Sequence, residues 1–206
     1  MKIGPKYKIA RRLGAPVFEK TQTQKFTLSQ AKKSGGQRNR KHMSQMTDFN
    51  KQLREKQKAR YSYILTEKQF SGYVKMSLKQ KTGDKAGNLF EILESRLDNI
   101  VWRAGLASTK MAARQIVSHG HILVNGKRTT IPSRQIKTGD KITIRSQSLG
   151  KGIFTDLEKN PNKQSIPDWI EFDINKKEIT LISKPDLKKS DSLLFDLNSV
   201  LEFYSR

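Results

Sequence analysis

The chain has no cysteine among its 206 residues. Disulfide bonds, thiolate zinc sites and cysteine nucleophiles are therefore excluded, and the composition fits a reducing compartment. Long hydrophobic runs are missing as well, because no stretch approaches the roughly 20 apolar residues that span a bilayer. No basic helix has the strong apolar face of an interfacial membrane helix either. A membrane surface is therefore a poor candidate for the partner.

Acidic residues are scarce. Lys and Arg number 41 and Asp and Glu 19, which gives a formal net charge of +22. Such an excess indicates a polyanionic partner, because each Lys or Arg that neutralises a phosphate releases a bound counterion. The excess is uneven: it is +14 over residues 1–60 and +8 over 96–150, but +1 over 61–95 and −1 over 151–206. Two segments thus carry nearly all of the attraction for a polyanion.

The first 47 residues have no sustained hydrophobic period and include the basic stretch AKKSGGQRNRKH. We expect a basic N-terminal extension that builds no core alone and becomes ordered against its partner. Thr47 or Asp48 then caps a helix that begins near Phe49. This helix has a thin apolar stripe and a broad basic face, and the neighbouring charge favours a phosphate backbone over solvent as the surface it meets.

Two more helices are expected before the middle of the chain. Thr66 and Gln69 form a capping box in front of a helical apolar pattern. The string KTGDKAGN follows, and it is read as a turn because the GxxxxGK[ST] phosphate-loop pattern is absent. The string LFEILESRLDNIVWRAG then predicts one continuous helix, which ends at Gly105.

The stretch ASTKMAARQIVSHGHILVNGK predicts a helix, a strand and a turn. Ser108 or Thr109 is the expected N-cap, and Gly120 ends the helix. The strand HILVN leads into Asn125-Gly126, the pair that favours a type I′ hairpin turn. KITIR supplies a later strand. The result is a small α+β unit whose basic residues lie on the helix and hairpin side.

His119 and His121 flank the helix-ending glycine. A zinc site needs four ligands, and carboxylates are few in this segment, so a metal site is disfavoured. A catalytic triad with Ser118 is also disfavoured, because no motif supports it. Two interpretations stay open for the histidines: exposed polar side chains at a helix end, or contacts to phosphate or ribose.

The string RLDNIVWRAGLASTKMAARQIVSHGHILVNGKRTTIPS resembles the S4 RNA-binding domain. QLREKQKARYSYILTEKQF, GPKYKIARRLG and the ending LNSVLEFYSR are similar to the bacterial-type S4 family of small-subunit ribosomal proteins. The likeness covers nearly the whole chain in the right order. Some members of the family carry a cysteine zinc motif near the N-terminus, which this chain lacks.

The resemblance implies an α+β fold: an N-terminal, mostly helical domain into which an S4 RNA-binding domain of helices on a small antiparallel sheet is inserted. The expected division is a basic extension over 1–47, a helical domain over 48–95 completed by 190–206, and the RNA-binding domain over 96–189.

The resemblance also implies a function without catalysis or cofactor. It implies a structural constituent of the small ribosomal subunit, in bacterial cytoplasm or plastid stroma. Such a protein binds small-subunit rRNA early, nucleates assembly of the subunit body and contributes to translational accuracy. Small-subunit ribosomal protein number five and mRNA, in the channel through which it enters the subunit, are the other implied partners.

Two sets of contact residues are expected. The mRNA set is Arg38, Arg40 and Lys41. The rRNA set is Lys6, Arg11, Arg12, Arg54, Lys56, Lys58, Arg60, Arg96, Arg103, Lys110, Arg114, Gln115, His119, His121, Asn125, Lys127 and Arg128.

Two other classes of function stay open. An RNA-modifying enzyme with an S4-type domain needs a catalytic Asp after that domain. Asp156, Asp168 and Asp173 are present there, but none lies in a motif that supports this role. A DNA-binding helix-turn-helix is the second, although the hairpin and the basic N-terminal arm fit RNA better.

Overall fold

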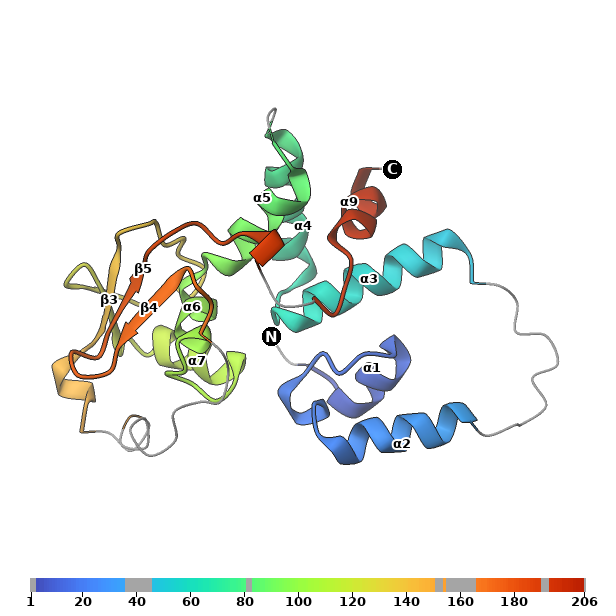
Figure 1. Cartoon of the computed structure of the whole chain (residues 1–206), viewed down its shortest axis with the longest axis horizontal. Coiled ribbons are helices and arrows are strands. Elements are labelled where there is room, and N and C mark those ends of the chain that lie inside the picture. Colours follow the sequence, from blue (N-terminus) through green and yellow to red (C-terminus); the bar gives the residue numbers. More distant parts are fainter. Residues whose placement is uncertain are drawn as a thin grey trace. The chain divides into compact units, whose positions relative to one another are not determined.

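A computed structural model describes residues 3–35, 46–80, 83–150, 154, 166–189 and 193–205 (Figure 1). The chain forms two compact units, one of residues 1–86 with 191–206 and one of residues 87–190. The first unit is helical. Its elements are α1 (Lys6–Leu13), the 3-10 turn η1 (Glu19–Thr21), α2 (Gln24–Gly35), α3 (Asp48–Ser62), α4 (Glu67–Lys79) and α9 (Leu197–Ser205).

The second unit combines helices with a sheet, which confirms the α+β class. Helix α5 (Lys85–Glu94) leads into it from the first unit. Its other elements are α6 (Leu97–Arg103), α7 (Lys110–Ser118), β1 (Ile122–Val124), β2 (Lys127–Thr129), β3 (Lys141–Ile144), η2 (Ser146–Ser148), β4 (Ile170–Asp173), β5 (Glu178–Leu181) and η3 (Leu187–Lys189). None of the helices in the described part of the chain is long and apolar enough to cross a membrane.

The N-terminal segment builds a small core, so our prediction that it builds none alone was wrong. The buried residues of this core are Ala10, Leu13, Ala15, Val17, Phe18 and Phe26, and Tyr61 of α3 packs against them. Gly14 ends α1 in the left-handed region, with φ 69°, and so lets the chain turn back. A search for one sustained period misses this core, because two short helices and the turn between them share it.

The expected helix starts are confirmed. Thr47 Oγ1 accepts a hydrogen bond from the amide of Asn50 at 3.4 Å. Thr66 Oγ1 accepts one from the amide of Gln69 at 3.3 Å. The C-terminal helix α9 packs along α3 and against α4 (Figure 1), so both ends of the chain belong to the first unit.

The single helix predicted through LFEILESRLDNIVWRAG is wrong, because the structure has two helices there. Arg96 has an extended backbone, with ψ 137°, between α5 and α6. It forms a β-bridge with Gln135, and the amide of Leu97 donates to the carbonyl of Arg134 at 2.9 Å. Backbone groups that would bond within a continuous helix therefore bond to a distant segment instead. Hydrophobic periodicity gives no sign of such a bond, because it depends only on the local sequence.

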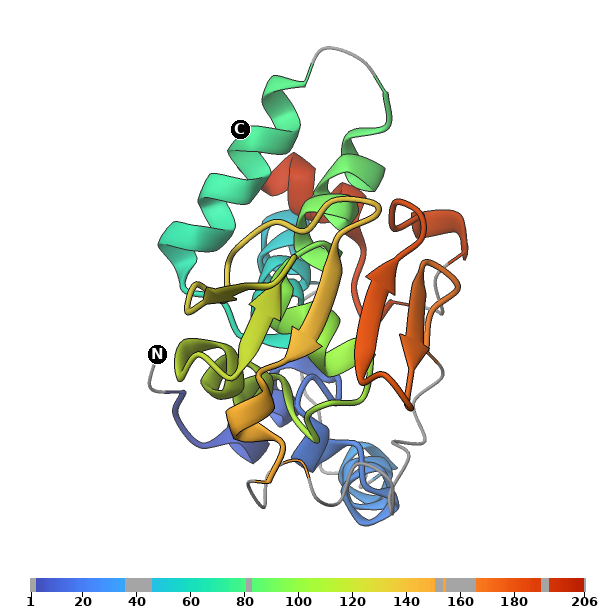
Figure 2. The ribbon, with the colours of Figure 1, turned by 90° about the vertical axis from the view of Figure 1, so that its left-hand side faces the viewer.

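The five strands form one antiparallel sheet in the order β2-β1-β3-β5-β4 (Figure 2). Ile122, Val124 and Ile142 are fully buried on its inner face, where α6 and α7 lie. Asn125 and Gly126 join β1 to β2 with φ 50° and 74°, which confirms the expected turn.

Candidate nucleic-acid interface

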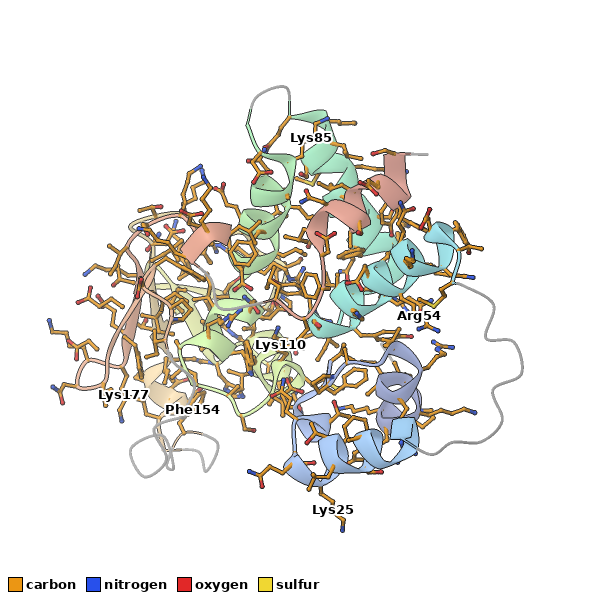
Figure 3. All side chains as sticks on the ribbon, turned by 45° about the vertical axis from the view of Figure 1, so that its right-hand side comes forward. Lys25, Arg54, Lys85, Lys110, Phe154 and Lys177 are labelled. Carbon is orange, nitrogen blue, oxygen red and sulfur yellow. The ribbon has the colours of Figure 1, made fainter. Side chains whose placement is uncertain are left out.

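Helix α7 carries one polar face of the second unit. Thr109 Oγ1 accepts from the amide of Ala112 at 3.1 Å, which fixes the start of the helix and selects Thr109 as the N-cap. Gln115 and His119 are exposed, so both side chains are available for a contact. Lys110, labelled in Figure 3, is half-buried, and its ammonium lies 4.3 Å from the centroid of a Trp102 ring. This cation–π contact holds the charge near the start of α7.

The β1–β2 hairpin presents a second group of exposed side chains. Lys127 and Arg128 on β2 are both exposed. Arg128 reaches back to the end of α7, where its Nη2 donates to the carbonyl of His119 at 3.3 Å. Arg128 therefore links the hairpin to the end of α7. We call Gln115, His119, Lys127 and Arg128 the α7–hairpin surface.

Asn125 fixes the shape of the hairpin. Its Nδ2 donates to Asp140 Oδ1 at 2.8 Å, and its Oδ1 accepts from the amide of Lys141 at 2.9 Å. Burial raises the pKa of Asp140, but hydrogen bonds from the Lys137 amide and from Asn125, with nearby positive charges, leave that pKa below its ordinary value. Asp140 thus remains a charged acceptor that holds the turn.

The RLDN string forms an internal ion network. Asp98 Oδ1 accepts from Arg96 Nε at 3.0 Å, and Asp98 Oδ2 accepts from Arg96 Nη2 at 2.7 Å. Arg114 Nε and Nη2 donate to the same Oδ2 at 3.0 and 2.8 Å. Arg96 is only 1% exposed, so its prediction as an rRNA contact was wrong. Arg114 remains partly exposed, and Asp98 fixes its orientation.

Glu94 holds a second arginine of the predicted set. This buried carboxylate accepts from Arg103 Nε and Nη2 at 3.1 and 2.9 Å, and from Asn99 Nδ2 at 2.6 Å. The Arg103 guanidinium also lies 5.1 Å from the centroid of a Trp102 ring. Arg103 is partly exposed, but an acid at the end of α5 offsets its charge.

His121 is buried, and the prediction that it contacts RNA was wrong. Its Nδ1 lies 3.0 Å from Ser148 Oγ, and its ring centroid lies 6.1 Å from that of Phe154. His121 lies between the helix-ending Gly120 and β1, and its side chain points inward, where Ser148, 27 positions away, is its hydrogen-bond partner. Among the residues that the structure describes, no group of three His, Cys, Asp or Glu could hold a metal ion.

The basic face of α3 is narrower than predicted. Lys56 Nζ lies 2.9 Å from Glu67 Oε1 and 4.7 Å from the centroid of the Phe203 ring, and its side chain is 12% exposed. Lys58 pairs with Glu55 at 2.7 Å, and the Arg60 guanidinium lies 4.4 Å from the Tyr61 ring centroid. Phe203 of α9 covers Lys56, an arrangement that the pattern of α3 alone does not reveal, whereas Lys58 and Arg60 lie against Glu55 and Tyr61 of α3 itself.

Other basic residues of the first unit do face outward. Arg11, Arg12 and Arg54 are exposed, and Arg54 is labelled in Figure 3. Lys6 is half-buried, with its ammonium 5.8 Å from the Phe18 ring centroid. We call Arg11, Arg12 and Arg54 the α1–α3 basic residues. Arg38, Arg40 and Lys41 lie outside the described residues.

Comparisons with known proteins agree along the chain. Residues 1–94 match the family model of the ribosomal protein S4/S9 N-terminal domain, and residues 95–142 match that of the S4 domain. The small ribosomal subunit protein uS4 of Ligilactobacillus salivarius is 42% identical over 204 residues, which cover 98% of both chains. That of Thermotoga maritima is 37% identical over 206 residues, again 98% of both. The chain belongs to the uS4 family of small ribosomal subunit proteins.

Members of this family are ribosomal structural proteins and not enzymes. The RLDN string, which we took as a mark of the S4 domain, lies at the start of the match to that domain. Its side chains build the interior of the second unit and do not face outward.

Sequence reasoning missed the acids that orient the arginines. Asp98 and Glu94 were not in the predicted set, although each accepts hydrogen bonds from an arginine that was. The sequence did contain a signal for Asp98. Residues 96–150 have ten basic and only two acidic side chains, so each acid there is surrounded in sequence by arginines and lysines that it could bind. The second acid of that segment, Asp140, also holds a predicted residue, Asn125.

Proposed function

We propose that the chain binds small-subunit rRNA through the α7–hairpin surface and the α1–α3 basic residues, and that this binding nucleates assembly of the subunit body. The observation that carries the proposal is the α7–hairpin surface. It places exposed donors of one helix end and one strand close together, with Arg128 of the hairpin bonded to the end of α7. The two acids of residues 96–150, Asp98 and Asp140, lie in the interior and in the turn network of Asn125. Family membership supports rRNA as the polyanion.

The surface fits structured RNA better than single strands. A-form RNA hides its major groove, so proteins bind its phosphates, 2′-hydroxyls and junction shape. Arginine, lysine, glutamine and histidine side chains supply donors for such contacts. Single-strand binders use exposed aromatic platforms, and none of the phenylalanine or tryptophan rings described in residues 87–190 is exposed.

The proposal extends to two further partners. Arg38, Arg40 and Lys41 would line the channel through which mRNA enters the subunit, where basic side chains hold single-stranded phosphates. Small-subunit ribosomal protein number five would be the protein neighbour, and the two contacts together would contribute to translational accuracy. The net charge of +14 over residues 1–60 supports the mRNA role, and the family resemblance supports both.

A competition experiment tests the rRNA proposal. The full chain is titrated into a labelled fragment of the small-subunit rRNA 5′ domain, with unlabelled rRNA fragment or duplex DNA of equal length as competitor at fixed salt. We expect the rRNA competitor to displace the label at a concentration at least about tenfold lower than the DNA, because specific sites exceed the nonspecific electrostatic background. Equal competition by both would contradict the proposal and favour a general polyanion binder.

A further inference from the structure

Gly120 lies at the junction between α7 and β1. Its φ is 73°, and its amide donates to the carbonyl of Val117 at 2.8 Å, while the amide of His121 donates to that of Ile116 at 3.2 Å. This pattern ends a helix and suits glycine, although asparagine also adopts the left-handed region. The backbone alone therefore does not require glycine.

The side chain of Arg128 supplies a second requirement. A Cβ atom at Gly120 would overlap Arg128 Nε and would lie 2.5 Å from Nη2 and 2.7 Å from Cζ. These distances are far inside van der Waals contact, so the guanidinium occupies the space that any side chain at Gly120 would need. Nothing lies within 4 Å of the corresponding position at Gly139, a glycine of the same unit with φ 88°.

Two interactions hold the guanidinium in this place. Its Nη2 donates to the carbonyl of His119, and the C-terminal end of α7 carries the partial negative charge of the helix dipole. An arginine that is already held in one position loses less conformational entropy when it binds a ligand. Arg128 is nevertheless exposed, and so is His119 beside it.

We propose that Gly120 is a positioning residue for Arg128, and that Arg128 contacts a backbone phosphate of rRNA. This inference rests on the proposed function and deepens it, because it names the ligand group at the α7–hairpin surface. A guanidinium presents several N–H groups in a planar fork, so it can donate to a phosphate while one N–H remains on the His119 carbonyl. Because Gly120 has no side chain, the guanidinium has room to lie against the end of α7.

A double-mutant cycle tests the inference. The affinity for the rRNA 5′-domain fragment and its salt dependence are measured for wild type, Gly120→Ala, Arg128→Ala and the double variant. We expect each single variant to lose about tenfold in affinity, the loss typical of one charged hydrogen bond. Each should also lower the magnitude of the slope of log K against log salt by about one, which corresponds to the loss of one phosphate contact. The double variant should bind no more weakly than Arg128→Ala alone.

Two further variants separate positioning from helix capping. Gly120→Asn tolerates the left-handed backbone but still displaces Arg128, so it should behave like Gly120→Ala in binding while remaining folded. Gly139→Ala has the same kind of backbone strain without touching an arginine, so its affinity and salt slope should stay within about twofold of wild type. The tryptophan fluorescence of each variant, measured at the binding concentration, shows whether the second unit is folded.

The outcomes separate this inference from the proposed function. If Gly120→Ala lowers the affinity for rRNA by the same factor in wild type and in Arg128→Ala, Gly120 does not act through Arg128 and the positioning role is overturned. Wild-type affinity of Gly120→Asn would overturn it as well. Full affinity of Arg128→Ala would overturn the phosphate contact while wild-type binding to rRNA still stands. Failure of the wild type to distinguish rRNA from duplex DNA would overturn the proposed function and this inference with it.

Discussion

Tyr204 of α9 donates its hydroxyl hydrogen to Oε1 of Glu67 in the first turn of α4, with the two oxygens 2.6 Å apart. Lys56 of α3 donates to the same carboxylate oxygen at 2.9 Å. One acid thus joins three helices of the first unit. Burial raises the pKa of Glu67, but the hydrogen bonds from Tyr204 and Lys56 and the charges of Lys56 and Arg60 leave it below its ordinary value. Glu67 is therefore a charged acceptor at neutral pH.

The first prediction concerns stability at high pH. Burial and Glu67 raise the pKa of Tyr204 above 10.0, the ordinary value for tyrosine. The folded state therefore keeps this proton after the unfolded chain has lost it, and the stabilisation that is complete below pH 10 declines as pH rises further. Tyr204→Phe should cost about 1 kcal/mol near pH 8 and should show a smaller loss between about pH 9 and pH 11 than wild type.

Urea unfolding followed by circular dichroism measures both effects. Tyr7→Phe is the control, because Tyr7 is 47% exposed on α1. It should follow the wild-type curve across the alkaline range. A Tyr204→Phe curve parallel to that of wild type would contradict the role of the Glu67 hydrogen bond.

The second prediction separates two basic residues of α3 that sequence reasoning treated alike. Arg54 is exposed, whereas Lys56 is covered by Glu67 and the Phe203 ring. Arg54→Ala should lower the slope of log K against log salt for rRNA binding by about one and leave the unfolding midpoint unchanged. Lys56→Ala should leave the slope unchanged and lower the free energy of unfolding by about 1 kcal/mol. A lower slope for Lys56→Ala, together with an unchanged slope for Arg54→Ala, would show that Lys56 faces the RNA.

The third prediction concerns the ion network inside the second unit. Asp98→Asn removes the charge that Arg96 and Arg114 share, and Arg96 is buried without access to water. Breaking a buried pair by removing one partner costs about 3 kcal/mol or more. Both tryptophans of the chain, Trp102 and Trp169, lie in residues 87–190, so their fluorescence during urea unfolding reports on this unit.

The matched control is a more exposed ion pair of the same unit. Glu178→Gln removes the partner of Lys141, whose side chain is 63% exposed. Its cost should be below about 1 kcal/mol. Similar midpoints for Asp98→Asn and Glu178→Gln would mean that the Asp98 network contributes little to stability.

The fourth prediction concerns Arg38, Arg40 and Lys41. Replacing all three with Ala should reduce rRNA binding only in part, since the α7–hairpin surface and the α1–α3 basic residues remain. In reconstituted small subunits, movement through a structured mRNA should fall more than assembly does. Loss of assembly with normal movement in the surviving particles would make this stretch an rRNA anchor and remove its proposed mRNA role.

Sequence reasoning succeeded where the decisive interactions are local. The caps at Thr47, Thr66 and Thr109 each involve an amide three residues ahead, and the Asn125-Gly126 turn is set by its own two φ angles. Short segments therefore contain the information that places the three caps and selects the turn type, although Asp140 then supports the turn from 15 positions away. Recognition of the family rested on such segments as well.

Several of its failures concern a partner that lies far along the chain. Arg114 meets Asp98 across 16 positions, and His121 meets Ser148 across 27. The segment that breaks the predicted long helix lies near Gln135, about 40 positions beyond the break. A basic side chain can face a phosphate or a buried acid with the same local pattern, so net charge predicts the kind of partner but not the set of contacts.

The position of α9 has a consequence for synthesis on the ribosome. Glu67 and Tyr204 are 137 positions apart, and the whole second unit is made between them. At typical elongation rates of roughly 5 to 20 residues per second, the nascent chain therefore carries α3 and α4 for on the order of ten seconds before α9 is available. During that interval Lys56 lacks its cover from Phe203, and the growing chain presents a more basic helix to nearby RNA than the finished protein does.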